Sequence, residues 1–95
     1  MRGLTQMSIR KQYVQLLTTI FSREVNRSRK SCKLTQAQMA QRLCMDERSY
    51  IKLEHGQSCC GGLTLLLFLI YCCEDVPAFL ANAKALLEST FDRAA

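Results

Sequence analysis

The fold of this 95-residue chain is decided by residues 34–56, which read LTQAQMAQRLCMDERSYIKLEHG. Thr35 stands three residues before Gln38, the spacing of a capping box, which predicts a helix start at Thr35. Asp46 is a second good N-cap residue, and Gly56 suits the left-handed position that follows a helix end. The stretch therefore predicts two short helices joined by about four residues, the second stopping at Gly56.

On the N-terminal side of this pair, apolar residues recur at steps of three and four over Ile9–Val25, the period of one helical face. One long helix over residues 5–31 fits this pattern, and so do two helices broken near residues 18–19. Neither Gly nor Pro interrupts residues 4–55, and the alternation typical of strands is missing. The expected fold class is all-α.

On the C-terminal side, Gly61 and Gly62 precede an apolar run, Leu63–Cys73, of eleven residues. A helix that spans a bilayer takes about 20 residues, so this run is interpreted as a buried element of a soluble protein. Asp75 and then Pro77 mark the start of a last helix. Five helices are expected in all.

The length allows one domain, residues 1–95, since domains usually take roughly 100 to 200 residues. Within it we expect an N-terminal helical extension over 1–19, a core motif over 34–56 and a C-terminal helix over 76–93. Hydrophobic residues at 48% and charged residues at 22% exclude a disordered tail or a fibrous repeat.

Positive charge is concentrated in residues 1–33, where eight Lys and Arg face a single acid, while residues 34–95 have a net charge of −2. A basic segment of this kind favours an anionic partner, either nucleic acid or an anionic membrane surface. Charge alone does not choose between the two.

The spaced residues of the core motif resemble those of the Cro and lambda-repressor (XRE-type) family of helix-turn-helix DNA-binding domains. The resemblance extends over roughly residues 20–75 and implies a five-helix lambda-repressor-like domain with an extended N-terminal helix. It also implies a sequence-specific transcriptional regulator, a repressor that reads a palindromic operator in double-stranded DNA as a homodimer. The residues that carry the resemblance are Leu34, Thr35, Gln36, Met39, Ala40, Leu43, Cys44, Met45, Asp46, Tyr50, Leu53, Glu54, His55 and Gly56.

The resemblance assigns roles by position in this motif. An Arg29–Glu54 salt bridge is predicted to hold the first helix against the reading helix, because an unpaired acid beside a buried surface is costly. Base-reading contacts are expected from Glu47, Arg48, Ser49 and Lys52, with Ile51 beside them. Phosphate contacts are expected from Gln36, His55, Gln57 and Ser58.

Four features depart from the family pattern. Residues 59–62 stand where relatives often have a basic loop and Pro, which removes phosphate ligands, and Glu47 adds a negative charge near the DNA that weakens binding unless it meets a cytosine. Cys44 replaces the usual turn glycine, so that the turn must accept either a left-handed backbone or a different shape. Ile51 occupies a place that is usually polar, where it could touch a thymine methyl group or be buried against the first helix.

Residues 65–70 form a helix that is apolar all round, which a 95-residue monomer cannot cover on every side. We therefore expect a homodimer that uses the outer faces of the last two helices. The alternative is a protein-interaction module, such as an antitoxin that holds a partner protein with these helices. The expected interface residues are Leu69, Phe79, Leu80, Ala83 and Leu87.

Six cysteines are present without a CxxC pair, which favours structural packing over a metal site or thiol sensing. The sequence has no Ser-His-Asp arrangement, no Gly-rich phosphate loop and no pair of catalytic carboxylates, so neither an enzyme nor a cofactor is expected. The first residues lack the pattern of a secretory signal, which predicts a cytoplasmic, reducing compartment. No membrane partner is expected.

Overall fold

The apolar period of the N-terminal third forms one helix and not two, because α1 runs Gln6–Ser31 without a break. The backbone has no break at Thr18 and Thr19, which both lie within the helix. Their hydroxyls donate to backbone carbonyls four residues back, Thr18 to Val14 over 2.8 Å and Thr19 to Gln15 over 3.2 Å. Such local bonding satisfies the hydroxyls without interrupting the backbone ladder.

The computed structural model describes residues 6–91, and these form five α-helices with no strand among them. The prediction of an all-α chain with five helices is confirmed. The ends of the expected N-terminal extension (1–19) and C-terminal helix (76–93) lie outside the described residues. The helices are α1 (Gln6–Ser31), α2 (Gln36–Arg42), α3 (Glu47–Glu54), α4 (Gly62–Tyr71) and α5 (Val76–Phe91).

The ends of α2 and α3 follow from the capping residues in the sequence. Thr35 and Gln38 exchange hydrogen bonds as a capping box, with donor–acceptor distances of 3.1 and 2.9 Å. Asp46 caps α3 by accepting from the backbone amide of Ser49 at 3.1 Å. Cys44 takes the left-handed backbone that its position required, with φ of 56°, and Gly56 ends α3 with φ of 72°.

The core lies where α1, α2, α3 and α4 meet. Phe68 of α4 is fully buried there, in edge-on contact with Phe21 of α1, their ring centroids 5.1 Å apart. The Ser28 hydroxyl donates to the carbonyl of Cys72 over 2.8 Å, which ties the end of α1 to the end of α4. The largest fully buried side chains are Tyr50, Phe21, Phe68, Met39, Leu43 and Val25.

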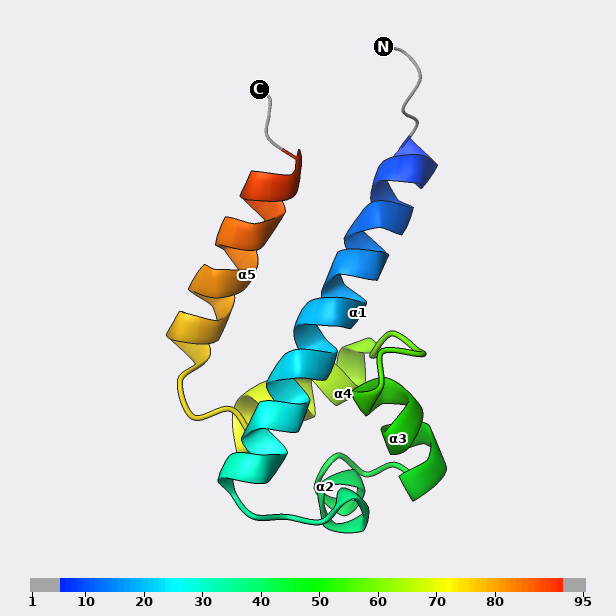
Figure 1. Ribbon diagram of the computed structural model, residues 1–95, viewed down its shortest axis with the longest axis vertical. Helices are drawn as coiled ribbons and strands as arrows, with labels where there is room; N and C mark the ends of the chain where they lie inside the picture. The colour runs from blue at the N-terminus through cyan, green and yellow to red at the C-terminus, as the bar shows by residue number, and fades with distance from the viewer. Residues whose placement is uncertain (1–5, 92–95) are drawn as a thin grey trace.

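Helix α5 runs antiparallel to the N-terminal half of α1, beyond the level of the other helices (Figure 1). It begins where the sequence predicted, since Asp75 accepts a hydrogen bond of 3.0 Å from the amide of Ala78. Between the two helices lies an open, largely apolar cavity of about 350 Å³. Its lining residues are Arg10, Tyr13, Val14, Leu17, Ile20, Ala83 and Leu87.

This arrangement corrects one residue of the expected dimer interface, Phe79. Phe79 is buried, its ring centroid 6.0 Å from that of Phe68, so it belongs to the core of its own chain. Ala83 and Leu87 line the cavity beside α1, and Leu69 is half-buried against the core. The sequence pattern marked these residues as apolar but could not say which of them a neighbouring helix covers. Of the five expected interface residues only Leu80 is largely exposed, at 51%.

Helix α4 is covered on one side only, although its sequence is apolar all round. Phe68 is its one fully buried residue, and Leu65 and Leu67 are half-buried against the core. The opposite face is open to solvent. No membrane-spanning helix is found in the described part of the chain.

The six cysteines are all free thiols. Cys72 is buried and Cys60 and Cys73 are half-buried, as structural packing predicts, and burial raises the pKa of Cys60 to about 11. The other three, Cys32, Cys44 and Cys59, are exposed, so packing does not account for them. Residues 6–91 contain no cluster of side chains that could hold a metal ion.

Candidate nucleic-acid interface

Helix α3 presents a polar face to solvent because its apolar residues fall on one side. Tyr50 and Leu53 point into the core and are almost fully buried, at 0% and 3% exposure. Arg48 and Lys52 lie four residues apart, which places both on one face of the helix. The four expected base-reading residues, Glu47, Arg48, Ser49 and Lys52, are all exposed, and Ile51 beside them is half-buried.

The first turn of α3 is held by its cap. Besides the amide bond to Asp46, the hydroxyl of Ser49 donates to the second oxygen of the Asp46 carboxylate over 2.8 Å. These hydrogen bonds lower the pKa of Asp46, the hydroxyl of Ser49 contributing most. The hydroxyl hydrogen of Ser49 is therefore already used, and a base could meet Ser49 only through its oxygen as an acceptor.

Behind this face, the carboxylate of Glu54 joins three helices. Arg29 of α1 donates to it through Nε over 2.6 Å and through Nη2 over 3.4 Å, so the predicted salt bridge is present. The hydroxyl of Tyr50 donates over 2.7 Å and the amide of Gln36 over 2.8 Å. Arg29 Nη1 also donates to the carbonyl of Leu34 over 3.0 Å. The side chain of Glu54 is only 2% exposed, so its charge is compensated inside the protein.

The protonation equilibria of this network follow from burial and hydrogen bonding. Burial acts to raise the pKa of Glu54, but the donors Arg29, Gln36 and Tyr50 outweigh it and lower that pKa. The pKa of Arg29 is raised by its bond to Glu54, and the pKa of Tyr50 is raised by burial and by the same carboxylate. At neutral pH the network is thus a carboxylate with three donors, which fixes α3 against α1 and α2.

The network changes the expected role of Gln36. Its side-chain nitrogen is committed to Glu54, so Gln36 holds the start of α2 against α3, a structural function that sequence reasoning missed. A phosphate contact from its side chain would have to use the second amide hydrogen. The spacing of Tyr50 four residues before Glu54 was the sequence signal for the hydroxyl contact, because such residues are neighbours on a helix.

The remaining expected phosphate ligands lie where α3 ends. His55 and Gln57 are exposed and Ser58 is half-buried. The amide of Gln57 donates to the carbonyl of Lys52 over 2.8 Å, which turns the chain sharply at Gly56. These residues therefore lie near the end of the same helix that carries Arg48 and Lys52.

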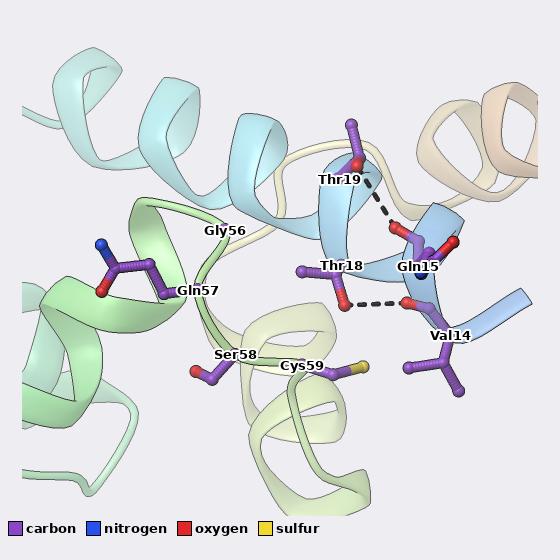
Figure 2. Close-up of a pocket in the computed structure, with 8 residues that line it drawn as sticks. All are labelled: Val14, Gln15, Thr18, Thr19, Gly56, Gln57, Ser58 and Cys59. Carbon is purple, nitrogen blue, oxygen red and sulfur yellow. Dashed lines mark hydrogen bonds between the residues drawn. The ribbon is translucent and has the colours of Figure 1, made fainter. Parts of the chain in front are cut away.

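Beyond this turn, the chain borders an open cavity of about 380 Å³ against α1 (Figure 2). On the α1 side, the hydroxyls of Thr18 and Thr19 donate to carbonyls of their own helix and not into the cavity. No charged side chain lines it, so it is a neutral hollow beside the candidate interface. Its lining residues are Val14, Gln15, Thr18, Thr19, Gly56, Gln57, Ser58 and Cys59.

Exposed cations are abundant on α1 and on the turn that follows it. Arg27 forms an ion pair with Glu24 one helical turn away, and Arg29 is used by Glu54. The other cations of the described part of the basic segment are exposed: Arg10, Lys11, Arg23, Lys30 and Lys33.

No protein-family model, no curated protein and no solved structure matches this chain.

Proposed function

We propose that this chain is a sequence-specific DNA-binding transcriptional regulator, a cytoplasmic repressor of the Cro and lambda-repressor type that reads a palindromic operator as a homodimer. Helix α3 would enter the major groove, which is wide enough for a helix. Arg48 and Lys52 would donate to guanine, and Glu47 would accept from a cytosine amino group. His55, Gln57 and Ser58 would contact phosphates.

One observation carries the proposal: α3 is held rigidly from behind while its polar face is left open. The buried carboxylate of Glu54 binds donors from α1, α2 and α3 itself, so the direction of α3 is set by its contacts with α1 and α2. The expected base-reading residues on the opposite face are exposed. A reading helix needs this combination, because base contacts require side chains placed to within a fraction of an ångström.

Two further features support the proposal. The exposed cations of the basic first third would favour a polyanion over a neutral partner. In addition, the two short helices α2 and α3 meet at the tight turn around Cys44, as in a helix-turn-helix unit.

Selection of bound sites from a random DNA pool tests the proposal directly. We expect the parent chain to enrich a defined sequence, and Arg48→Ala to relax the base preference at one position, a loss of about 1 to 3 kcal/mol of discrimination. Gln57→Ala should instead weaken binding to all sequences alike, as loss of a phosphate contact does. Lys84→Ala, which removes an exposed cation of α5, is the matched control and should leave the preference unchanged. A pool without enrichment would overturn the proposal.

A second function is favoured by the open apolar face of α4. A protein-interaction module, such as an antitoxin, would use this face to hold a partner protein, and its α3 would not need to discriminate between DNA sequences. A second protein that co-purifies in a fixed ratio, together with a random pool that shows no enrichment, would favour this function.

A further inference from the structure

The outer face of α4 carries a continuous row of uncovered apolar side chains, which we call the α4 stripe. Leu63, Leu66 and Ile70 follow one another at steps of three and four residues and so share one side of the helix. Tyr71 lies next to them at the end of α4. Their exposed fractions are 68% for Leu63, 58% for Leu66, 65% for Ile70 and 68% for Tyr71.

We propose that a second copy of this chain covers the α4 stripe, with the two α4 helices packed antiparallel across a two-fold axis. The proposal deepens the proposed function, since a palindrome requires two copies. It places the contact on residues of α4 other than those expected from the sequence, of which Phe79 is buried in its own chain.

The uncovered area agrees with what a dimer needs. With about 200 Å² for a large side chain, the α4 stripe exposes on the order of 500 Å² of mostly apolar surface. A standard interface buries about 800 Å² per partner, of which about 65% is apolar in homodimers. The exposed area of the α4 stripe is therefore about equal to the apolar area that one partner buries in such an interface.

The absence of charged residues along α4 favours a partner surface that is also apolar and uncharged. No charged residue occurs between residues 56 and 73, a stretch of 18 residues that contains all of α4. Helices that lie on anionic membranes carry Lys or Arg beside their apolar face, and α4 carries neither. Arg42 of α2 lines an open pocket with Tyr71 at the end of α4, but a charged protein surface would find no counterpart along Leu63, Leu66 and Ile70. A second α4 stripe is equally apolar and uncharged, and an interface about a two-fold axis brings the same patch of both copies together.

The direction of the pairing follows from the helix dipole and from the spacing of the stripe. Parallel α4 helices would place like ends of their dipoles together, whereas antiparallel helices place opposite ends together. The stripe is centred near Leu66, and Leu63 and Ile70 lie about 10 Å apart along the axis. An antiparallel pair thus brings Leu66 against Leu66 of the second copy, and Leu63 against Ile70 of the second copy.

Sedimentation equilibrium of the full chain, without DNA and with a reducing agent, tests this interface. The reductant removes disulfide-linked dimers that the exposed free cysteines could form. We expect a reversible dimer whose Kd rises roughly a hundredfold or more in Leu66→Lys, because two lysine side chains would be buried at the centre without acidic partners. Ile70→Lys, a second variant at a largely exposed position, should act in the same direction.

Leu86→Lys is the matched control, since Leu86 is 43% exposed but lies on α5, away from the stripe. Its Kd should equal that of the parent, and circular dichroism should show parental helicity in all three variants. A parent that stays monomeric at every concentration, or a folded Leu66→Lys chain with the Kd of the parent, would overturn the inference. A parent that dimerises through the stripe yet enriches no DNA sequence would support the interface and overturn the proposed function.

Discussion

At the scale of single residues, Glu54 has the largest influence on the candidate interface. It is an acid with 5% exposure on the inner side of α3, and its charge is tolerated because Arg29, Gln36 and Tyr50 all donate to it. A buried ion pair of this kind adds little net stability compared with apolar residues, but removal of one partner is expensive. The network therefore acts mainly by specifying how α3 is oriented.

Replacement of Arg29 by Met should expose this cost. Arg29→Met leaves Glu54 buried without its cation, and we expect the free energy of unfolding to fall by about 3 to 5 kcal/mol in urea titrations. Arg27→Met is the control, because the ion pair of Arg27 with Glu24 lies on the surface and should contribute little. Equal stability of Arg29→Met and the parent would contradict the structural role of the bridge.

The pH dependence of stability should report the same network. The pKa of Glu54 is lower in the folded chain than its ordinary value of 4.5. The contribution of ionised Glu54 to the free energy of unfolding is then fully present above pH 4.5. It is lost as the pH falls through the folded pKa of Glu54. Asp46, whose pKa is also lowered, adds a dependence of the same sign. Urea titrations at a series of pH values should show a steeper loss for the parent than for Glu54→Gln, and parallel curves would show that Glu54 is not the titrating group.

At the scale of elements, the turns before and after α3 determine its length and direction. Cys44 holds a left-handed backbone, which costs an ordinary residue roughly 1 to 2 kcal/mol relative to glycine. Gly56 holds the same conformation at the other end of α3. Glycine should therefore be the better residue at both positions, so that Cys44→Gly and Gly56→Ala should change the stability of the chain in opposite directions.

Cys44→Gly should stabilise the chain, by up to about 1 kcal/mol, because the relief of backbone strain is partly offset by the greater freedom of glycine in the unfolded chain. Gly56→Ala should destabilise it by a similar amount or more. A Cβ at Gly56 would lie 3.7 Å from the hydroxyl oxygen of Ser22, an ordinary contact, so the cost there is one of backbone conformation. Thermal unfolding measures both effects.

The control for this pair is Gly62→Ala. Gly62 is the first residue of α4, its φ is not positive, and a Cβ there meets nothing within 4 Å. Gly62→Ala should therefore not destabilise the chain, because alanine favours a helix more than glycine does. A loss equal to that of Gly56→Ala would mean that packing, and not the sign of φ, determines the effect.

At the scale of the whole molecule, the chain has three surfaces for which we propose different roles. The open face of α3 would read DNA, the exposed cations of α1 would attract it, and the α4 stripe would join two copies. The antiparallel pair of α1 and α5 extends beyond the level of the other helices (Figure 1).

The number of half-sites should depend on the α4 stripe. Site selection with the parent should recover two half-sites with centres about 34 to 36 Å apart, one turn of DNA. Leu66→Lys should recover a single half-site with the same base preference, because α3 is unchanged. Recovery of paired half-sites by a monomeric Leu66→Lys chain would contradict the link between dimerisation and operator symmetry.

The sequence by itself determined the local structure. The capping residues Thr35, Asp46 and Asp75, and Gly56 at the end of α3, predicted where helices begin and end because each acts on its own first or last turn. The same local rules, with the family resemblance, predicted the Arg29–Glu54 bridge and the open polar face of α3. They left open whether α1 is one helix or two, because the back-bonding of Thr18 and Thr19 depends on side-chain conformation.

Only the tertiary structure decided which apolar residues are covered. Phe79, Leu80 and Leu63 are alike in a hydropathy pattern, but Phe79 packs on Phe68, whereas Leu80 and Leu63 remain exposed. The commitment of Gln36 to Glu54 was equally invisible, because it joins residues 18 apart in the sequence. Periodicity reports that a residue is apolar and on which side of its helix it lies, while coverage depends on how neighbouring helices are placed in space.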